Sequence, residues 1–168
     1  IIQHGEVDFR DPRRDHTHGR IWRVTYKDRP LAKKPDFQKA TIYQLMELQT
    51  SPERFVRESA RREIRDRGAK ESVKPLKDWI SLKTDHNALL QGLWTLQALN
   101  TTDSLTIDRL LRSADARYRA AALRVLYHRA NEIPGHDEWI KKSIHDKNAQ
   151  VRLWAICCLA QKPSAKSV

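Results

Sequence analysis

Two hydrophobic periods follow one another along the chain. Residues 19–26 alternate between two faces, with Trp22, Val24 and Tyr26 on one of them, which predicts a half-buried β-strand. From Thr41 onward, apolar positions recur every three or four residues, which predicts α-helices. One or two strands cannot bury their faces alone, so we expect the strand to belong to a β domain that lies mostly outside this chain.

The helical part divides into four pairs of helices. The pairs are predicted at residues 41–49 with 53–67, 72–82 with 86–99, 105–112 with 115–130, and 137–145 with 148–161. Ser51-Pro52 separates the first two helices, because proline is favoured at the first helical position. Gly68 is expected to close the second helix.

The second helix of each pair carries a small residue at one aligned position. These residues are Ala60, Gly92, Ala122 and Ala155, and they are spaced by 32, 30 and 33 residues. A two-helix repeat of this period is typical of an α-solenoid. We expect helices to approach closely at the small residues, where a larger side chain would force them apart.

An arginine precedes the small residue by three positions in three of the four repeats. These arginines are Arg57, Arg119 and Arg152, and six residues before them lie Ser51, Ser113 and Asp146. The latter three are expected to cap the second helix or to accept a bond from an arginine of a neighbouring repeat. The pattern resembles HEAT repeats, in which such residues form a ladder between repeats. Over residues 41–161 this resemblance implies an all-α fold, an α-solenoid of about four HEAT-like helical hairpins.

The segment before the helices carries a second resemblance. The runs His4–Asp15 and His18–Val24 resemble the closing strands of a β-propeller found in planctomycete-type membrane-bound dehydrogenase-like or haem-binding CxxCH multidomain proteins. In that family a sorbosone- or glucose-dehydrogenase-like propeller precedes HEAT repeats and often a cytochrome c domain. The candidate propeller-end contacts are His4, Asp8, Arg10, Asp11, Arg20 and Trp22.

The family resemblance implies an exported, periplasmic or secreted parent protein that oxidises a sugar and passes electrons to haem c, with a quinone as a further cofactor by analogy. No CxxCH motif occurs in this chain, so neither activity is assigned to its residues. The implied partners are the propeller and cytochrome c domains of the same parent chain, or an acidic protein. The expected function is therefore that of a non-catalytic scaffold or spacer.

We divide the chain into four segments on these grounds. Residues 1–30 are expected to be the end of the propeller-like domain, 31–40 a linker, 41–163 the HEAT-like α-solenoid, and 164–168 a tail or linker. Because the chain begins at Ile1 without an initiator methionine, we expect it to be a segment of a larger protein.

The net charge of +11 suggests an anionic partner, although the excess is spread along the sequence. Five arginines of one helix form a candidate anion- or partner-binding ridge: Arg54, Arg57, Arg61, Arg62 and Arg65. The alternative is an ordinary solvated face, stabilised by charge pairs four residues apart. We favour the solvated face, with a structural role between repeats for Arg57.

A nucleic-acid-binding or DNA-repair module is the alternative function. Helical-repeat alkylpurine DNA glycosylases are also basic solenoids, and Trp79, Trp94, Trp139 and Trp154 could in principle stack on bases. Core packing is the preferred interpretation of these tryptophans, because each falls at an apolar position of its helix.

No catalytic, cofactor-binding or metal-binding residue is expected in this segment. Cys157 and Cys158 are adjacent, which is a poor geometry for a disulfide on a helix, and Cys158 falls at a core position. Asp15, His16 and His18 lack further ligands and are expected to form an exposed turn. No apolar run is long enough to cross a bilayer.

Overall fold

The computed structural model describes residues 10–13, 15, 17–19, 21, 23–25, 27, 28, 30 and 33–161. The chain separates into two units, Ile1–Lys33 and Lys34–Val168, and each is considered by itself. Among the described residues of the first unit none lies in a strand, and Ile21 and Val24 are fully exposed. The strand predicted at residues 19–26 is therefore not confirmed, and Trp22 and Tyr26 lie outside the described residues.

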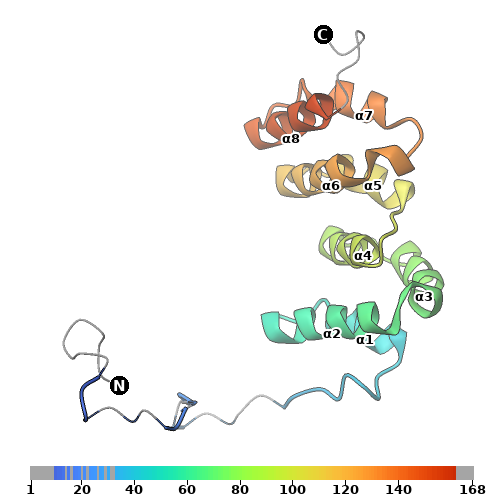
Figure 1. Ribbon diagram of the computed structural model, residues 1–168. Helices are drawn as coiled ribbons and strands as arrows, with labels where there is room; N and C mark the ends of the chain where they lie inside the picture. The colour runs from blue at the N-terminus through green and yellow to red at the C-terminus, as the bar shows by residue number, and fades with distance from the viewer. Residues whose placement is uncertain are drawn as a thin grey trace. The chain divides into compact units, whose positions relative to one another are not determined.

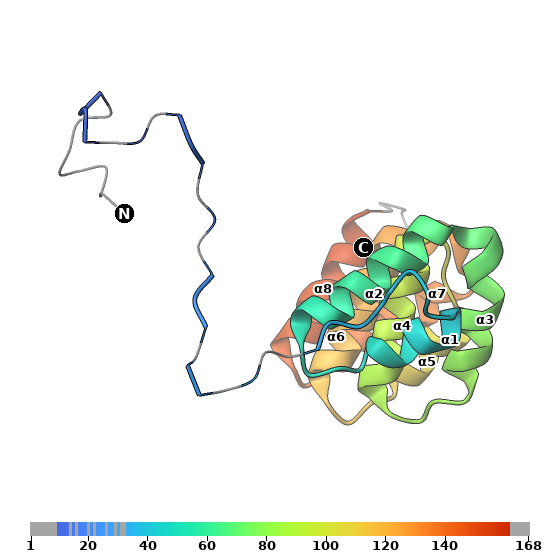
Figure 2. The same cartoon turned by 90° about the horizontal axis from the view of Figure 1, so that it is seen from below.

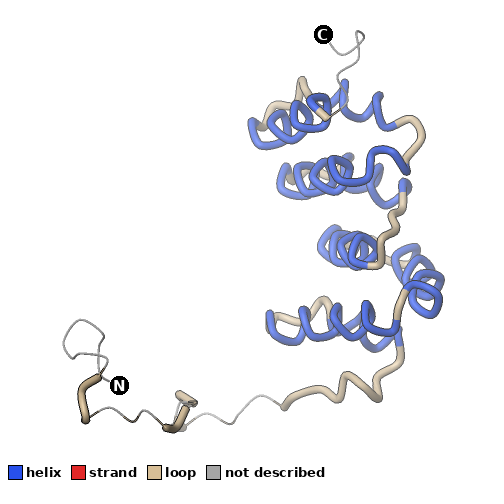
Figure 3. The backbone as a smooth tube through the Cα atoms, viewed as in Figure 1, coloured by secondary structure: helices blue, strands red, loops and turns tan. Residues whose placement is uncertain are grey.

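Helices are the only regular secondary structure in the described part of the second unit, which confirms the all-α class (Figures 1 and 3). Its helices are α1 (Ile42–Leu48), α2 (Arg54–Arg67), α3 (Ala69–Ser81), α4 (His86–Ala98), α5 (Ser104–Leu111), α6 (Ala116–Arg129), the 3-10 turn η1 (Ala130–Glu132), α7 (His136–Ser143) and α8 (Ala149–Ala160). No helix among them is long and apolar enough to cross a membrane.

The four predicted pairs correspond to α1–α2, α3–α4, α5–α6 and α7–α8. Gly68 has a φ of 85°, a value that favours glycine, and it ends α2 as predicted. Helix α3 begins directly after it at Ala69, three residues before the predicted start. Pro75 lies inside this helix.

The pairs stack in chain order, with the two members of each pair in separate layers (Figure 1). The second helices α2, α4, α6 and α8 form one layer, in which each contacts the next. We call this the second-helix layer, and the set α1, α3, α5 and α7 the first helices. Figure 2 looks along the stack, so that the pairs lie over one another.

The core runs between the two layers through all four pairs. Its largest fully buried side chains are Leu45, Met46, Ile64, Leu76, Leu89, Leu93, Leu96, Ile107, Leu110, Leu123, Leu126 and Ile133. All four helical tryptophans pack in or against this cluster, which confirms their interpretation as core residues. Trp79 is buried, and its Nε1 donates to the Glu47 carboxylate at 2.7 Å, so its polar edge has a partner.

Residues 34–40, predicted to be linker, lie against the helices of this unit. Phe37 and Ala40 pack on the core, and the Phe37 ring meets that of Phe55 edge-on at 6.3 Å between centroids. Arg67 Nη2 donates to the backbone carbonyls of Phe37 and Gln38, both at 3.1 Å. These contacts hold the segment against α2.

The aligned small residues are buried, and Gly92 shows why size is limited there. A methyl group added at Gly92 would lie 2.5 Å from Ile80 Cγ1 and 2.7 Å from Ile80 Cδ1. Ile80 is itself a buried core residue of α3, so it has little room to move. Glycine at this position therefore lets α3 and α4 approach more closely than alanine would.

We expect Gly92→Ala to destabilise the protein by about 1 kcal/mol, because overpacking outweighs the gain in helix propensity. In an Ile80→Ala background, which leaves a cavity at the same place, the same substitution should instead be stabilising. Urea unfolding of the four proteins of this cycle measures both effects. A stabilising Gly92→Ala in the wild-type background would contradict the close approach.

Candidate partner-binding surface

Arginines of the second-helix layer bind the turns that precede their helices. Nη1 of Arg57 donates to the carbonyls of Ser51 and Pro52, both at 2.8 Å. Arg119 binds those of Ser113 and Ala114 at 2.8 and 2.9 Å, and Arg152 those of Asp146 and Lys147 at 2.8 and 3.1 Å. Carbonyls beyond the end of a helix have no hydrogen-bond donor within the helix. The arginines therefore supply the donors that these turn carbonyls would otherwise lack.

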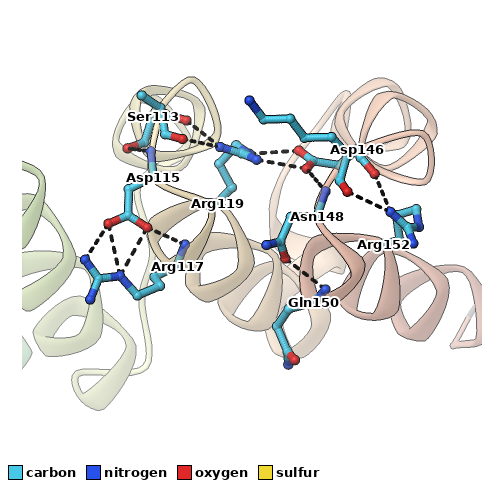
Figure 4. A network of polar contacts seen from close by, with 10 residues as sticks. Ser113, Asp115, Arg117, Arg119, Asp146, Asn148, Gln150 and Arg152 are labelled. Carbon is cyan, nitrogen blue, oxygen red and sulfur yellow. Dashed lines mark hydrogen bonds and ion pairs between the residues drawn. The ribbon is translucent and has the colours of Figure 1, made fainter.

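One of these arginines also links two repeats. The other edge of the Arg119 guanidinium donates from Nε and Nη2 to the two oxygens of Asp146, both at 2.8 Å (Figure 4). Asp146 also accepts the backbone N–H of Asn148 at 2.8 Å. The two side chains are only 10% and 15% exposed, so this bidentate pair is shielded from water. The bond from Arg119 lowers the pKa of Asp146 below its ordinary value, while the carboxylate raises the pKa of Arg119.

The structure corrects the expectation that Ser51, Ser113 and Asp146 cap the second helices. The N-cap positions lie two residues later, at Glu53, Asp115 and Asn148, and the last two cap through their side chains. Ser51, Ser113 and Asp146 instead accept the backbone N–H of these residues, at 3.2, 3.2 and 2.8 Å. Of these three residues, only Asp146 accepts from an arginine of another repeat. Ser113 has no such arginine to accept from, because the aligned position of the repeat before it is Leu89.

In the second repeat the turn carbonyl is bound by an arginine from a different helix. Leu89 occupies the arginine position, and Lys83 occupies the position of Asp146. The exposed carbonyl of Lys83 is bound by Nη2 of Arg109, which comes from α5 of the next repeat. Sequence reasoning missed Arg109, because its only signal is the absence of an arginine at position 89.

The predicted ridge on α2 does not form a single charged face. Arg54 and Arg65 are exposed and pair with Glu58 and Asp66, at 2.8 and 3.2 Å. Arg57 binds its turn, and Arg61 is partly buried against α4. Arg62 is exposed and lines a cavity of about 490 Å³ between α2 and residues 34–38.

Two arginines lie over tryptophan rings of the following repeat. The Arg61 guanidinium lies 5.7 Å from the Trp94 ring centre and donates to the side-chain oxygen of Gln91. Burial lowers the pKa of Arg61. Arg124 lies 5.6 Å from the ring centre of Trp154. Because these cations cover the rings, neither tryptophan offers a bare face for stacking on a base.

Positive charge is concentrated in the second-helix layer. The first helices carry six basic and six acidic residues, so their net charge is zero. The second helices carry eleven basic against three acidic residues, a net charge of +8, and all three carboxylates lie in α2. All eleven basic residues are arginines. Counting charge along the sequence missed this difference, because each repeat alternates between the layers.

Five arginines of this layer have no carboxylate partner among the described residues. They are Arg57, Arg61, Arg62, Arg124 and Arg152. Three of them bond to carbonyl or amide oxygens, which carry no formal charge to cancel theirs. The other two, Arg62 and Arg124, are exposed. We take the second-helix layer as the candidate partner-binding surface.

The remaining candidate chemistry is local. Cys158 is buried, its Sγ donates to the Leu123 carbonyl at 3.4 Å, and burial raises the pKa of the thiol to about 12. In the first unit, the backbone N–H groups of Thr17 and His18 donate to the Asp15 carboxylate at 3.1 Å. The bond from Thr17 is the main reason that the pKa of Asp15 falls to about 2. Within the described ranges no three His, Cys, Asp or Glu side chains gather as a metal site would need.

Most predicted propeller-end contacts lie outside the described residues. His4, Asp8, Arg20 and Trp22 are among these. Arg10 is exposed, and Asp11 accepts from the Arg13 side chain at 2.8 Å. Their expected role at a propeller therefore stays a prediction. No protein-family model, curated protein or solved structure matches this chain.

We expect Asp146→Asn to destabilise the protein by about 2 kcal/mol at pH 7, because it leaves Arg119 shielded from water with no carboxylate. A carboxyl group whose pKa is lowered by folding stabilises the folded state above its ordinary pKa and loses this effect as the pH falls through the lowered value. The difference between the two proteins should therefore be largest above about pH 4 and shrink below it. Urea unfolding at pH 7 and in acid measures both effects.

Asp78→Asn is the matched control, because Asp78 pairs with Lys74 at 3.2 Å but is 51% exposed. An exposed pair of this kind contributes about 0.5 kcal/mol or less. Equal costs for the two substitutions at pH 7 would show that the Arg119–Asp146 pair has no special role.

Proposed function

We propose that this chain is a HEAT-like α-solenoid that acts as a non-catalytic scaffold and binds an acidic protein segment along its second-helix layer. The observation that carries this function is the difference in charge between the two layers, zero for the first helices and +8 for the second. Complementary charge speeds the encounter with an anionic partner and orients it.

Serial stacking of the pairs supports the scaffold role. Each second helix contacts the next, and Arg119–Asp146 joins two repeats by a bidentate pair. A repeat array stabilised by contacts between neighbours offers an extended surface for a partner chain. An acidic peptide suits this surface better than nucleic acid, because Arg61 and Arg124 cover Trp94 and Trp154, two of the four tryptophans considered for stacking on bases.

A fluorescein-labelled polyglutamate peptide is the probe for this surface. Arg62→Gln combined with Arg124→Gln should weaken its binding about five- to tenfold at low salt, because two exposed charges without carboxylate partners are lost. Fluorescence anisotropy titration measures the dissociation constants. Binding should also weaken as salt rises from about 50 to 200 mM, because the interaction is electrostatic.

Lys70→Gln combined with Lys142→Gln is the matched control. Both lysines are exposed residues of first helices, and neither forms an ion pair with any residue that the structure describes. This variant loses the same charge and should bind the peptide almost as the wild type does. Equal weakening by the two variants would reject the second-helix layer as the binding surface. Much tighter binding of a single-stranded oligothymidine than of polyglutamate at about 150 mM salt would favour the nucleic-acid function instead.

The parent protein is the broader part of this proposal. The resemblance of residues 4–24 supports a scaffold within an exported sugar-dehydrogenase-like, haem-linked protein, where the partner would be a neighbouring domain. The native polypeptide that carries this segment should then have a mass far above 19.6 kDa and show a Soret band. A native mass equal to that of this chain, without haem absorbance, would reject the parent but leave the scaffold function open to the peptide test.

A further inference from the structure

The outer face of α8 exposes residues whose counterparts in the second and third repeats are buried. Ile156, one residue after the aligned small residue, is 56% exposed, whereas Leu93 and Leu123 at the same position are fully buried. Leu153, two residues before the small residue, is 51% exposed, and its counterparts Leu90 and Ala120 are buried.

The buried counterparts belong to helices that have a following neighbour. Helix α4 contacts α6, and α6 contacts α8 in the most extensive contact between any two elements. No described helix follows α8 in the layer (Figure 1). The side chains of Leu153 and Ile156 thus continue the interface seen between α4, α6 and α8, without the following helix that covers it in the second and third repeats.

Arg152 makes the same hydrogen bonds to its own turn as Arg119 does, but no described carboxylate binds the other edge of its guanidinium. Both donate Nη1 to the two carbonyls of their own turn, at 2.8–3.1 Å. Arg119 uses Nε and Nη2 for Asp146 of the next repeat, whereas Nε and Nη2 of Arg152 have no partner among the described residues (Figure 4). A guanidinium held by one edge is preoriented to bind a carboxylate with the other.

We propose that α8 docks a helical hairpin of the same repeat type from outside residues 1–168, and that this hairpin presents a carboxylate to Arg152 and apolar side chains to Leu153 and Ile156. Residues 162–168 contain no Asp or Glu, so they lack the required carboxylate. A second copy of the chain would offer Ser51 from its first hairpin at the position of Asp146. The matching partner is therefore a hairpin with an acidic residue just before its second helix.

The chain's own last hairpin provides a probe with this chemistry. A copy of residues 129–161 is placed directly after Gln161, in place of residues 162–168. The copied segment and the spacing from Ala122 to Ala155 are both 33 residues long, so the copied aspartate follows Arg152 by 27 residues, as Asp146 follows Arg119. Amide hydrogen exchange in α8 should slow about tenfold or more, because covering one leucine or isoleucine shifts local opening by at least that factor.

Two variants of the extended protein separate docking from mere lengthening. Changing the copied aspartate to asparagine should make exchange in α8 faster again, part of the way back to the rate in the unextended chain, because Arg152 loses its carboxylate. Leu153→Lys combined with Ile156→Lys should abolish the slowing while leaving exchange in α1–α6 unchanged, since both side chains are exposed in the original chain.

Unchanged exchange in α8 on extension would overturn the proposal, as would equal slowing with aspartate and asparagine. Sedimentation of the unextended chain tests the other occupant. A dimer that Leu153→Lys with Ile156→Lys dissociates would show that a second copy covers this face, and would overturn the proposed hairpin. A monomer is the expected result.

Discussion

The turns between paired helices impose the constraint on which this fold depends, because their backbone carbonyls have no partner within either helix. Arg57, Arg119 and Arg152 satisfy them from the helix that follows. Lysine could not do the same, since a planar guanidinium can bind carbonyls with one edge and a carboxylate with the other. In Arg119 both edges are used, so a single side chain joins a helix, its own turn and the next repeat.

This structural use of arginine also determines the electrostatics of the molecule. Carbonyl and amide oxygens hold a guanidinium without neutralising it, so positive charge remains in the layer that supplies the arginines. The proposed binding surface thus follows from the way the repeats are held together. Arg62 and Arg124 add charge that no carboxylate of the described residues offsets by contact.

The second repeat shows that the fold requires a donor to the turn carbonyl, and that this donor need not be an arginine at one fixed position of the repeat. Leu89 replaces the arginine there, yet the Lys83 carbonyl is still bound, by Arg109 of the next repeat. In the same repeat Gly92 replaces alanine, and Ile80 fills the space that a methyl group would occupy. The departures from the repeat pattern are therefore accompanied by local changes in packing and in donor.

The sequence by itself determined the all-α class, the four helix pairs, the end of α2 at Gly68 and the packing of the helical tryptophans on the core. These features depend on residues within one or two helical turns of each other, whose preferences can be read locally. Only the tertiary structure decided the partners of Arg61 and Arg109, which lie 30 and 26 residues away, and which of the candidate ladder residues joins two repeats. It alone also decided which layer carries the charge and which face of α8 is uncovered. Distances between repeats depend on how the helices pack, and spacing along the chain does not contain them.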